Sequence, residues 1–420
     1  MHHPAFGLLG MALILLVAFL ASNDRKSIRP RVVLVCFALQ VLIAVFVLYS
    51  SFGQSLLGTM SEKITTLLSY ADAGIDMVFG GLAGDNIGFS FLVRVLPVVI
   101  FFAALMEVLY HLKVMQFIVR YGGKGIRWLT GTKPVESLNV VANIFVGQTE
   151  APLSLKPYLP GISKNELFTI MVSGLASISG TVMAGYIQLG IELEYLIAAC
   201  FMSAPAGLLM AKIIMPDPIA PVVNAGVEAA DAPVVPDTDI FSIADERKHP
   251  NVIMAAAVGA QNGIQLAVSI GAMLLAFVSL IALCNGLLGW AGGFFGQGDL
   301  TLQSILGWIF APVMYMLNVP WAEAQQAGAI FGEKVVLNEF IAYLSLVDVQ
   351  GDLSPRTVVI LTFALCGFAN LGSIAILLGG LGALIPDRMS DIAEMGIKAV
   401  FAASLANLMS AALAGILVAI

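Results

Sequence analysis

Apolar stretches long enough to cross a bilayer recur from end to end of this chain. This pattern constrains the fold more than any other feature of the sequence. Of the 420 residues, 59% are hydrophobic and 11% are charged, whereas a soluble protein of this size has roughly a quarter of its residues charged. One span needs about 20 apolar residues, so there is room for roughly eight spans plus shorter pieces. The sequence therefore predicts an all-α integral membrane protein.

Basic residues between the expected spans predict the orientation in the membrane. One group separates the first two spans and a second group follows the third span: Arg25, Lys26, Arg29 and Arg31, then Lys113, Arg120, Lys124, Arg127 and Lys133. Such loops stay cytoplasmic, so we expect the N- and C-termini on the outer side. Residues 114–129 are typical of an amphipathic helix on the cytoplasmic surface, and residues 56–78 of a helix along the outer interface.

Residues 137–159 do not fit a straight span. Their ends are apolar, but Gly147 and Pro152 interrupt the middle and Glu150 lies at its centre. A re-entrant hairpin, two half-helices meeting at a tip buried in protein, accommodates this pattern. A second hairpin is expected between Trp321 and Tyr343, with Glu339 as its central carboxylate.

The two halves of the chain resemble each other. The string GLASISGT from Gly174 aligns with GFANLGSI from Gly367, so that Ser177 falls on Asn370. A hairpin with a central glutamate precedes each string at a similar distance, and a span rich in Ala, Ser and Met follows. Paired interrupted segments are typical of secondary transporters. We expect an inverted repeat if residues 302–319 lie flat on the outer face, and a parallel repeat if they cross.

This organisation predicts six segments along the chain. They are spans one to three with an outer interfacial helix (1–112), the cytoplasmic amphipathic helix (113–133), repeat 1 with hairpin 1, broken span four and span five (134–215), a cytoplasmic linker (216–250), span six with an outer interfacial helix (251–319), and repeat 2 with hairpin 2, broken span seven and span eight (320–420).

Polar groups at membrane depth indicate the kind of ligand. A carboxylate at the bilayer centre costs about 2.5–3.5 kcal/mol, so Glu150 and Glu339 are expected to have a function. Amides, hydroxyls and carboxylates without arginine suit a neutral, polyhydroxylated, heterocyclic solute better than an anion. By contrast, Glu333 and Lys334 are expected to be a solvated or locally paired set at the flank of hairpin 2.

Other functional classes find little support. The net charge is −7 and no basic face is available for nucleic acid. There is no Ser–His–Asp set, no phosphate loop and no metal-ligand spacing of histidines or cysteines. We therefore expect neither an enzyme nor an organic cofactor, although a membrane enzyme or channel stays open as a lesser alternative.

Three strings identify a family. GQTEAPL (147–153), NEFIAY (338–343) and CGFANLGSIAI (366–376) resemble the concentrative nucleoside transporters, in particular bacterial, sodium-coupled members with eight spans and two re-entrant hairpins. The resemblance implies a homotrimer in the bacterial inner membrane that imports nucleosides by elevator-like alternating access. Each protomer would have a scaffold part, spans one to three and six, and a moving transport part, the two repeats. It also implies that residues 302–319 lie along the outer face. A proton-coupled nucleoside carrier or a nucleobase carrier of the same architecture is the alternative.

The resemblance also implies ligand sites. The base would contact Gln148, Thr149 and Glu150, with Val182 beside them. The ribose hydroxyls would contact Glu339, Asn370 and Ser373, and Phe368 would line the pocket. Sodium, the coupling ion, would be bound by Asn143, Val146, Ser177 and Ile178. The sequence departs from some relatives at Gly372, where they have serine.

Overall fold

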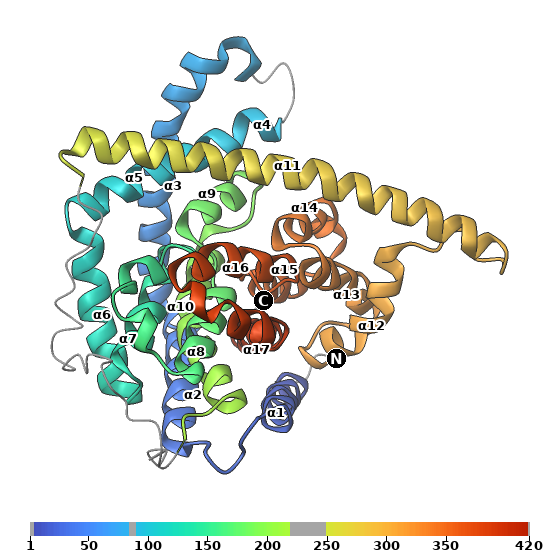
Figure 1. The fold of residues 1–420 in the computed structure, drawn as a ribbon. Helices are drawn as coiled ribbons and strands as arrows, with labels where there is room; N and C mark the ends of the chain where they lie inside the picture. The colour runs from blue at the N-terminus through green and yellow to red at the C-terminus, as the bar shows by residue number, and fades with distance from the viewer. Residues whose placement is uncertain (1–3, 84–89, 219–248, 419–420) are drawn as a thin grey trace.

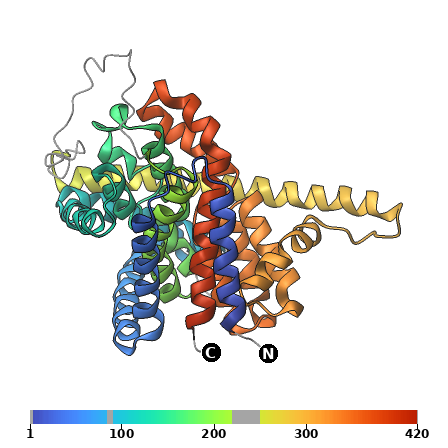
Figure 2. The ribbon, with the colours of Figure 1, turned by 90° about the horizontal axis from the view of Figure 1, so that it is seen from below.

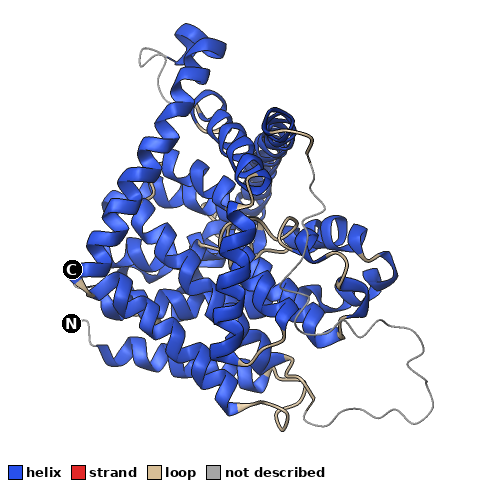
Figure 3. Cartoon of the chain, turned by 90° about the vertical axis from the view of Figure 1, so that its left-hand side faces the viewer, coloured by secondary structure: helices blue, strands red, loops and turns tan. Residues whose placement is uncertain are grey.

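The computed structural model describes residues 4–83, 90–218 and 249–418, and throughout these ranges the chain forms helices and connecting segments without strands (Figure 3). Six helices are long and apolar enough to cross a membrane. The shorter first helix and the two short helices of predicted span seven (355–384) bring the total to the roughly eight predicted spans. The all-α prediction is confirmed. The predicted linker, 216–250, lies almost wholly outside the described residues.

Within the described residues, the N-terminal part of the chain forms five α-helices. They are α1 (Pro4–Leu20), α2 (Pro30–Ala44) with a π-helical turn (Val45–Tyr49), α3 (Ser51–Phe79), α4 (Phe91–Arg94) and α5 (Leu96–His111). The Ser50 side chain caps α3 by accepting a hydrogen bond from the Gly53 N–H. Helix α1 packs along the C-terminal helix α17 (Met389–Leu417), so the first and last described helices lie side by side (Figure 2).

Helix α6 (Val114–Thr130) is amphipathic, as predicted. Its inner face lies on hairpin 1, where Gly122 and Gly123 allow close approach to Val141 and Leu138. Its outer face carries exposed aromatic side chains, among them Trp128 at 82% exposure.

Hairpin 1 differs from the expected pair of half-helices. Its first arm is α7 (Pro134–Ala142), but the second arm consists of turns and two 3-10 segments (Pro152–Leu155 and Leu159–Gly161). Prolines at positions 152, 157 and 160 lack the N–H group that a continuous α-helix requires. The prediction of a second half-helix is therefore wrong.

Both predicted broken spans are broken. Helices α8 (Lys164–Ala176) and α9 (Gly180–Gln188) are separated by residues 177–179. Helices α15 (Pro355–Leu365) and α16 (Gly372–Leu384) are separated by residues 366–371. Each is followed by a closing helix, α10 (Leu193–Ile214) and α17 (Met389–Leu417), which pack on both broken spans and on each other to form the core (Figure 1).

A 42-residue helix, α11 (Val252–Gly293), connects the halves and is longer than the predicted span six. Its C-terminal part extends away from the other helices (Figure 1, Figure 2). The chain then forms α12 (Leu302–Met316), α13 (Trp321–Val336) and α14 (Glu339–Val349). Helices α12 and α13 are bent by 118° relative to each other. Gly307 and Gly328 let them pack backbone against backbone.

Candidate functional site

The two helix breaks meet at the centre of the molecule. The Phe368 N–H of the second break donates to the Ser177 carbonyl of the first at 3.3 Å, and the Gly180 N–H donates to the Phe145 carbonyl in the tip of hairpin 1 at 3.0 Å. Broken helices leave backbone groups without intrahelical partners, and these groups are available to ligands. One tip and two breaks thus converge on one buried place.

The four predicted sodium ligands lie together there. Asn143, Val146, Ser177 and Ile178 are all buried. The Ser177 hydroxyl donates to the Asn143 carbonyl at 2.8 Å, and the Asn143 amide donates to the Asn139 carbonyl at 2.9 Å. Among the described residues, Asn143 Oδ1 has no hydrogen-bond partner. A buried amide oxygen without a partner is a hard oxygen donor, so this set fits a sodium ion.

The predicted ribose set forms a connected network. Glu339 is the first residue of α14, and its Oε1 accepts from the Tyr186 hydroxyl at 3.0 Å. Its Oε2 accepts from the Asn370 amide at 3.0 Å, and Asn370 Oδ1 accepts from the Ser373 N–H at 2.8 Å. Ser373 Oγ is buried and has no partner within the described part of the chain. The network therefore retains acceptor and hydroxyl capacity for a ligand.

The predicted base set lies on the tip of hairpin 1. Gln148 is buried against Gly174 of α8, and its Oε1 lacks a partner among the residues described. Thr149 lies against Gly380 of α16. Thr149, Glu150 and, in the second break, Phe368 are all partly exposed. Val182 is buried in the first turn of α9, where its N–H donates to the Ser179 hydroxyl that caps this helix.

Three residues of this centre were missed by sequence reasoning, namely Tyr186, Lys334 and Asn407. The expectation for Glu333 and Lys334 is wrong, because both are buried. Glu333 accepts from Gln303 of α12 at 2.9 Å, and Lys334 donates to Asn407 Oδ1 at 2.8 Å. The signal was present, since an ionisable residue in an apolar membrane segment is usually buried with a partner and functional.

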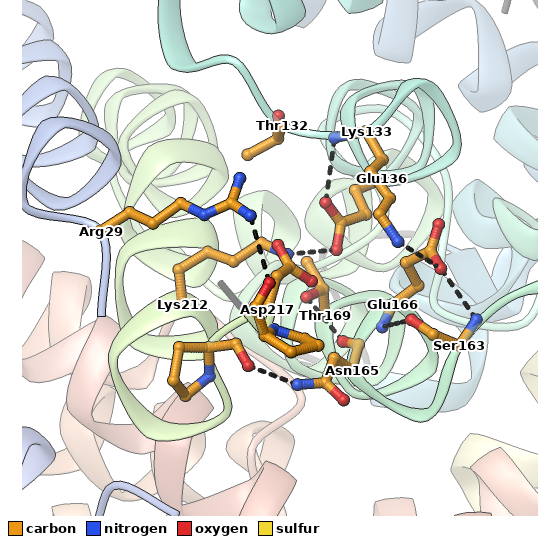
Figure 4. Close-up of polar contacts among 12 residues, drawn as sticks. Arg29, Thr132, Lys133, Glu136, Ser163, Asn165, Glu166, Thr169, Lys212 and Asp217 are labelled. Atoms are coloured by element: carbon orange, nitrogen blue, oxygen red, sulfur yellow. Dashed lines mark hydrogen bonds and ion pairs between the residues drawn. The ribbon is translucent and has the colours of Figure 1, made fainter. Parts of the chain in front are cut away.

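Hairpin 1 is anchored by a cluster of charges away from its tip (Figure 4). Lys212 of α10 forms ion pairs with Glu136 of α7 at 2.5 Å and with Asp217 at 2.7 Å, and the side chains of Glu136 and Lys212 are 0% and 5% exposed. Lys133 pairs with Glu166 of α8 at 2.9 Å. Buried ion pairs are costly to break singly, so this cluster fixes the first arm of the hairpin against α8 and α10.

Comparison with known families agrees with this arrangement. Residues 195–415 match the family described as the C-terminal part of Na+ dependent nucleoside transporters. Residues 9–82 match the N-terminal part of the same transporters, and residues 92–192 match a domain described as nucleoside recognition. The chain belongs to the concentrative nucleoside transporter family. The family and its structural neighbours are transporters, so the chain is a nucleoside transporter and not an enzyme.

Individual relatives extend along the whole chain. The nucleoside permease NupC of Helicobacter pylori is 43% identical over 98% of this chain and 97% of its own length. Human solute carrier family 28 member 3 is 36% identical over 98% of this chain, which spans 59% of that longer protein.

Solved structures show the same fold. The structure of CNTnw in an inward-facing, substrate-bound state has a TM-score of 0.90 and 47% identity over 98% of this chain and 97% of that chain. A CNTnw variant in an outward-facing state matches with a TM-score of 0.91 and 46% identity over 99% and 97%. The concentrative nucleoside transporter fold, with its re-entrant hairpins, is thereby established for this chain.

Proposed function

We propose that this transporter imports nucleosides by sodium symport. One observation carries the proposal. Side-chain oxygens of Asn143 and Gln148 in hairpin 1 have no hydrogen-bond partner within the described chain, and they lie beside the helix break that contacts the segment bearing Phe368. An ion site and a nucleoside site are thus parts of one cluster. The Na+ dependence in the family's description supports sodium as the ion.

The substrate is bound from both repeats. Gln148, Thr149 and Glu150, with Val182, contact the base. Glu339, Asn370 and Ser373 hold the ribose hydroxyls, and Phe368 lines the pocket. Each carboxylate oxygen of Glu339 can accept more than one hydrogen bond. Ribose hydroxyls therefore add to the bonds from Tyr186 and Asn370 and need not replace them.

Sodium binds first to Asn143 and Ser177, with backbone carbonyls of Val146 and Ile178. This joins the tip of hairpin 1 to the break in span four, and it fixes Gln148 two residues beyond Val146. The nucleoside then meets an ordered tip, so the ion should raise substrate affinity.

The gradient supplies sufficient free energy. One charge moving through 100 mV contributes about 2.3 kcal/mol, and a tenfold sodium gradient adds about 1.4 kcal/mol. At one sodium per nucleoside the sum is about 3.7 kcal/mol, which corresponds to roughly 500-fold accumulation.

We further propose elevator-like movement of two inverted repeats against a scaffold, in a homotrimer of the bacterial inner membrane with both termini outside. Helix α11 is suited to a scaffold within the membrane, because large apolar side chains such as Leu275, Leu283 and Trp290 are exposed along it. Such a surface requires lipid or neighbouring subunits as cover.

A binding titration tests the function. Purified protein is titrated with uridine, adenosine, inosine and uracil in sodium and in choline at constant ionic strength. We expect uridine to bind at least about tenfold more tightly in sodium, a typical size for such coupling, and uracil to bind more weakly than uridine. Tighter binding of uracil indicates a nucleobase carrier. Equal affinity in sodium and choline, with a dependence on pH, indicates proton coupling.

A further inference from the structure

A single buried amide links the two helix breaks. Asn407 of α17 is 1% exposed. Its Nδ2 donates to the Ala176 carbonyl at 2.7 Å and to the Cys366 carbonyl at 2.9 Å. Ala176 is the last residue of α8 and directly precedes Ser177, whereas Cys366 begins the second break, two residues before Phe368. One side chain therefore holds the segment of the sodium set and the segment of the ribose set.

The backbone is shaped around this amide. A Cβ atom at Gly367 would lie 2.5 Å from Asn407 Oδ1 and 2.9 Å from the Ala176 carbonyl oxygen. Both distances are too short for any side chain, so only glycine fits between the breaks at this position.

Lys334 fixes which way the amide faces. Its ammonium group is fully buried and donates to Asn407 Oδ1 at 2.8 Å and to the Ala364 carbonyl at 3.2 Å. Because an ammonium group has no acceptor, Oδ1 must face Lys334 and Nδ2 must face the two carbonyls. A flipped amide would lose all three bonds.

Lys334 also connects this amide to hairpin 2. It lies on α13, five residues before Glu339, which begins α14. Four elements thus meet at the Lys334–Asn407 pair: the first arm of hairpin 2, the two broken spans and the closing helix α17.

We propose that Lys334 and Asn407 are a positioning pair that couples sodium binding to nucleoside binding. The inference rests on the proposed sodium symport and deepens it. An ion bound at Ser177 and Ile178 fixes the backbone that follows Ala176. The Asn407 amide and the Ser177–Phe368 backbone bond pass this constraint to residues 366–370, where Phe368 and Asn370 contact the nucleoside. The coupling is reciprocal, so the nucleoside raises sodium affinity by the same factor.

Two variants and one matched control test the pair. Asn407→Leu removes both bonds to the breaks, and Lys334→Met removes the group that orients the amide. Ser410→Ala is the control, because Ser410 lies one turn further along α17 and is equally buried, and its Oγ accepts a hydrogen bond from Gln40 of α2 at 3.0 Å.

Calorimetry gives the uridine dissociation constant in sodium and in choline, and their ratio measures the coupling. We expect uridine to bind the wild type about tenfold or more tightly in sodium than in choline. In both pair variants the two dissociation constants should differ by less than about twofold. Ser410→Ala should keep the wild-type ratio. The ratio of the sodium dissociation constants without and with uridine should fall in the pair variants by the same factor. A general loss of packing would not change both ratios equally. If Asn407→Leu does not fold, Asn407→Ser and Lys334→Met carry the test.

The outcomes distinguish a failure of the proposed Lys334–Asn407 coupling from a failure of the proposed sodium symport. A sodium-dependent wild type with unchanged ratios in the folded pair variants overturns the role of Lys334 and Asn407 alone. A wild-type ratio of one overturns the sodium symport and, with it, the pair's proposed role.

Discussion

The two hairpins meet at one place, yet their polar groups are satisfied in different ways. Hairpin 1 is anchored by the buried Lys212–Glu136 pair away from its tip, and its tip leaves oxygens of Asn143 and Gln148 without partners among the described residues. In hairpin 2 both oxygens of the tip carboxylate Glu339 accept hydrogen bonds, and the atom left without a partner among the described residues is a donor, Asn338 Nδ2.

The difference indicates two roles. A buried polar atom without a partner costs about 1–3 kcal/mol, and a ligand that satisfies it recovers this free energy on binding. In the function proposed above, hairpin 1 receives an ion and a base, whereas hairpin 2 presents a preorganised carboxylate to the ribose. Four substitutions test this contrast.

The largest effect should come from the anchor of hairpin 1. Lys212→Met leaves Glu136 and Asp217 without their shared cation, and the expected loss of stability is about 3–5 kcal/mol. Thermal unfolding in detergent measures it, and adding Glu136→Gln should restore part of the loss. Lys164→Met, which removes an exposed pair with Glu394 and Asp391, should cost under about 1 kcal/mol. Equal melting temperatures of the two single variants would contradict the anchor.

The next effect concerns the preorganised tip. Glu339→Gln removes a charged acceptor of ribose hydroxyls, which should cost about 1.5–3 kcal/mol, or roughly 10- to 150-fold in uridine affinity. Glu333→Gln is the control, because this buried carboxylate bonds to Gln303 outside the ribose network. Uridine affinity of Glu339→Gln within twofold of wild type would contradict the ribose role.

A smaller effect is expected at the receiving tip. Asn143→Ala removes one neutral oxygen ligand, worth about 1 kcal/mol, so the sodium concentration for half-maximal uridine binding should rise about fivefold. Asn139→Ala, one turn earlier on α7, removes a buried bond to Ser173 and should lower stability while leaving sodium dependence within about twofold. Unchanged sodium dependence in Asn143→Ala with a shifted one in Asn139→Ala would mean that Asn143 does not bind the ion.

The smallest effect should come from Ser373. Its hydroxyl has no partner in the described chain, so Ser373→Ala should leave the melting temperature without ligand unchanged or higher. Uridine affinity should fall about two- to threefold, the equivalent of about 0.5 kcal/mol. Loss of stability with full uridine affinity would show that the hydroxyl serves the fold alone.

Much of this architecture is readable in the sequence. The apolar stretches predict the helices, and the interruptions at Ser177 and Asn370 mark both broken spans. The motif strings also locate Glu339, Asn370 and Ser373, which the structure places in one network. These features depend on residues close together in the chain, so local pattern suffices to find them.

The remainder depends on contacts between distant segments. Lys334 and Asn407 are 73 positions apart, and Asn407 and Ala176 are 231 apart, so no local pattern joins them. Tyr186 was missed for the same reason, because its bond to Glu339 crosses between the repeats. The second arm of hairpin 1 is a different case. Its prolines were visible, but a regular hairpin was expected despite the missing N–H donors.

Uptake into proteoliposomes tests the central claim most directly. Vesicles containing the purified protein are diluted into labelled uridine with an inward sodium gradient and an inside-negative potential, and in parallel with choline replacing sodium. The account predicts transient accumulation above the external concentration in sodium and only equilibration or less in choline. Identical uptake in the two media would contradict sodium-driven transport.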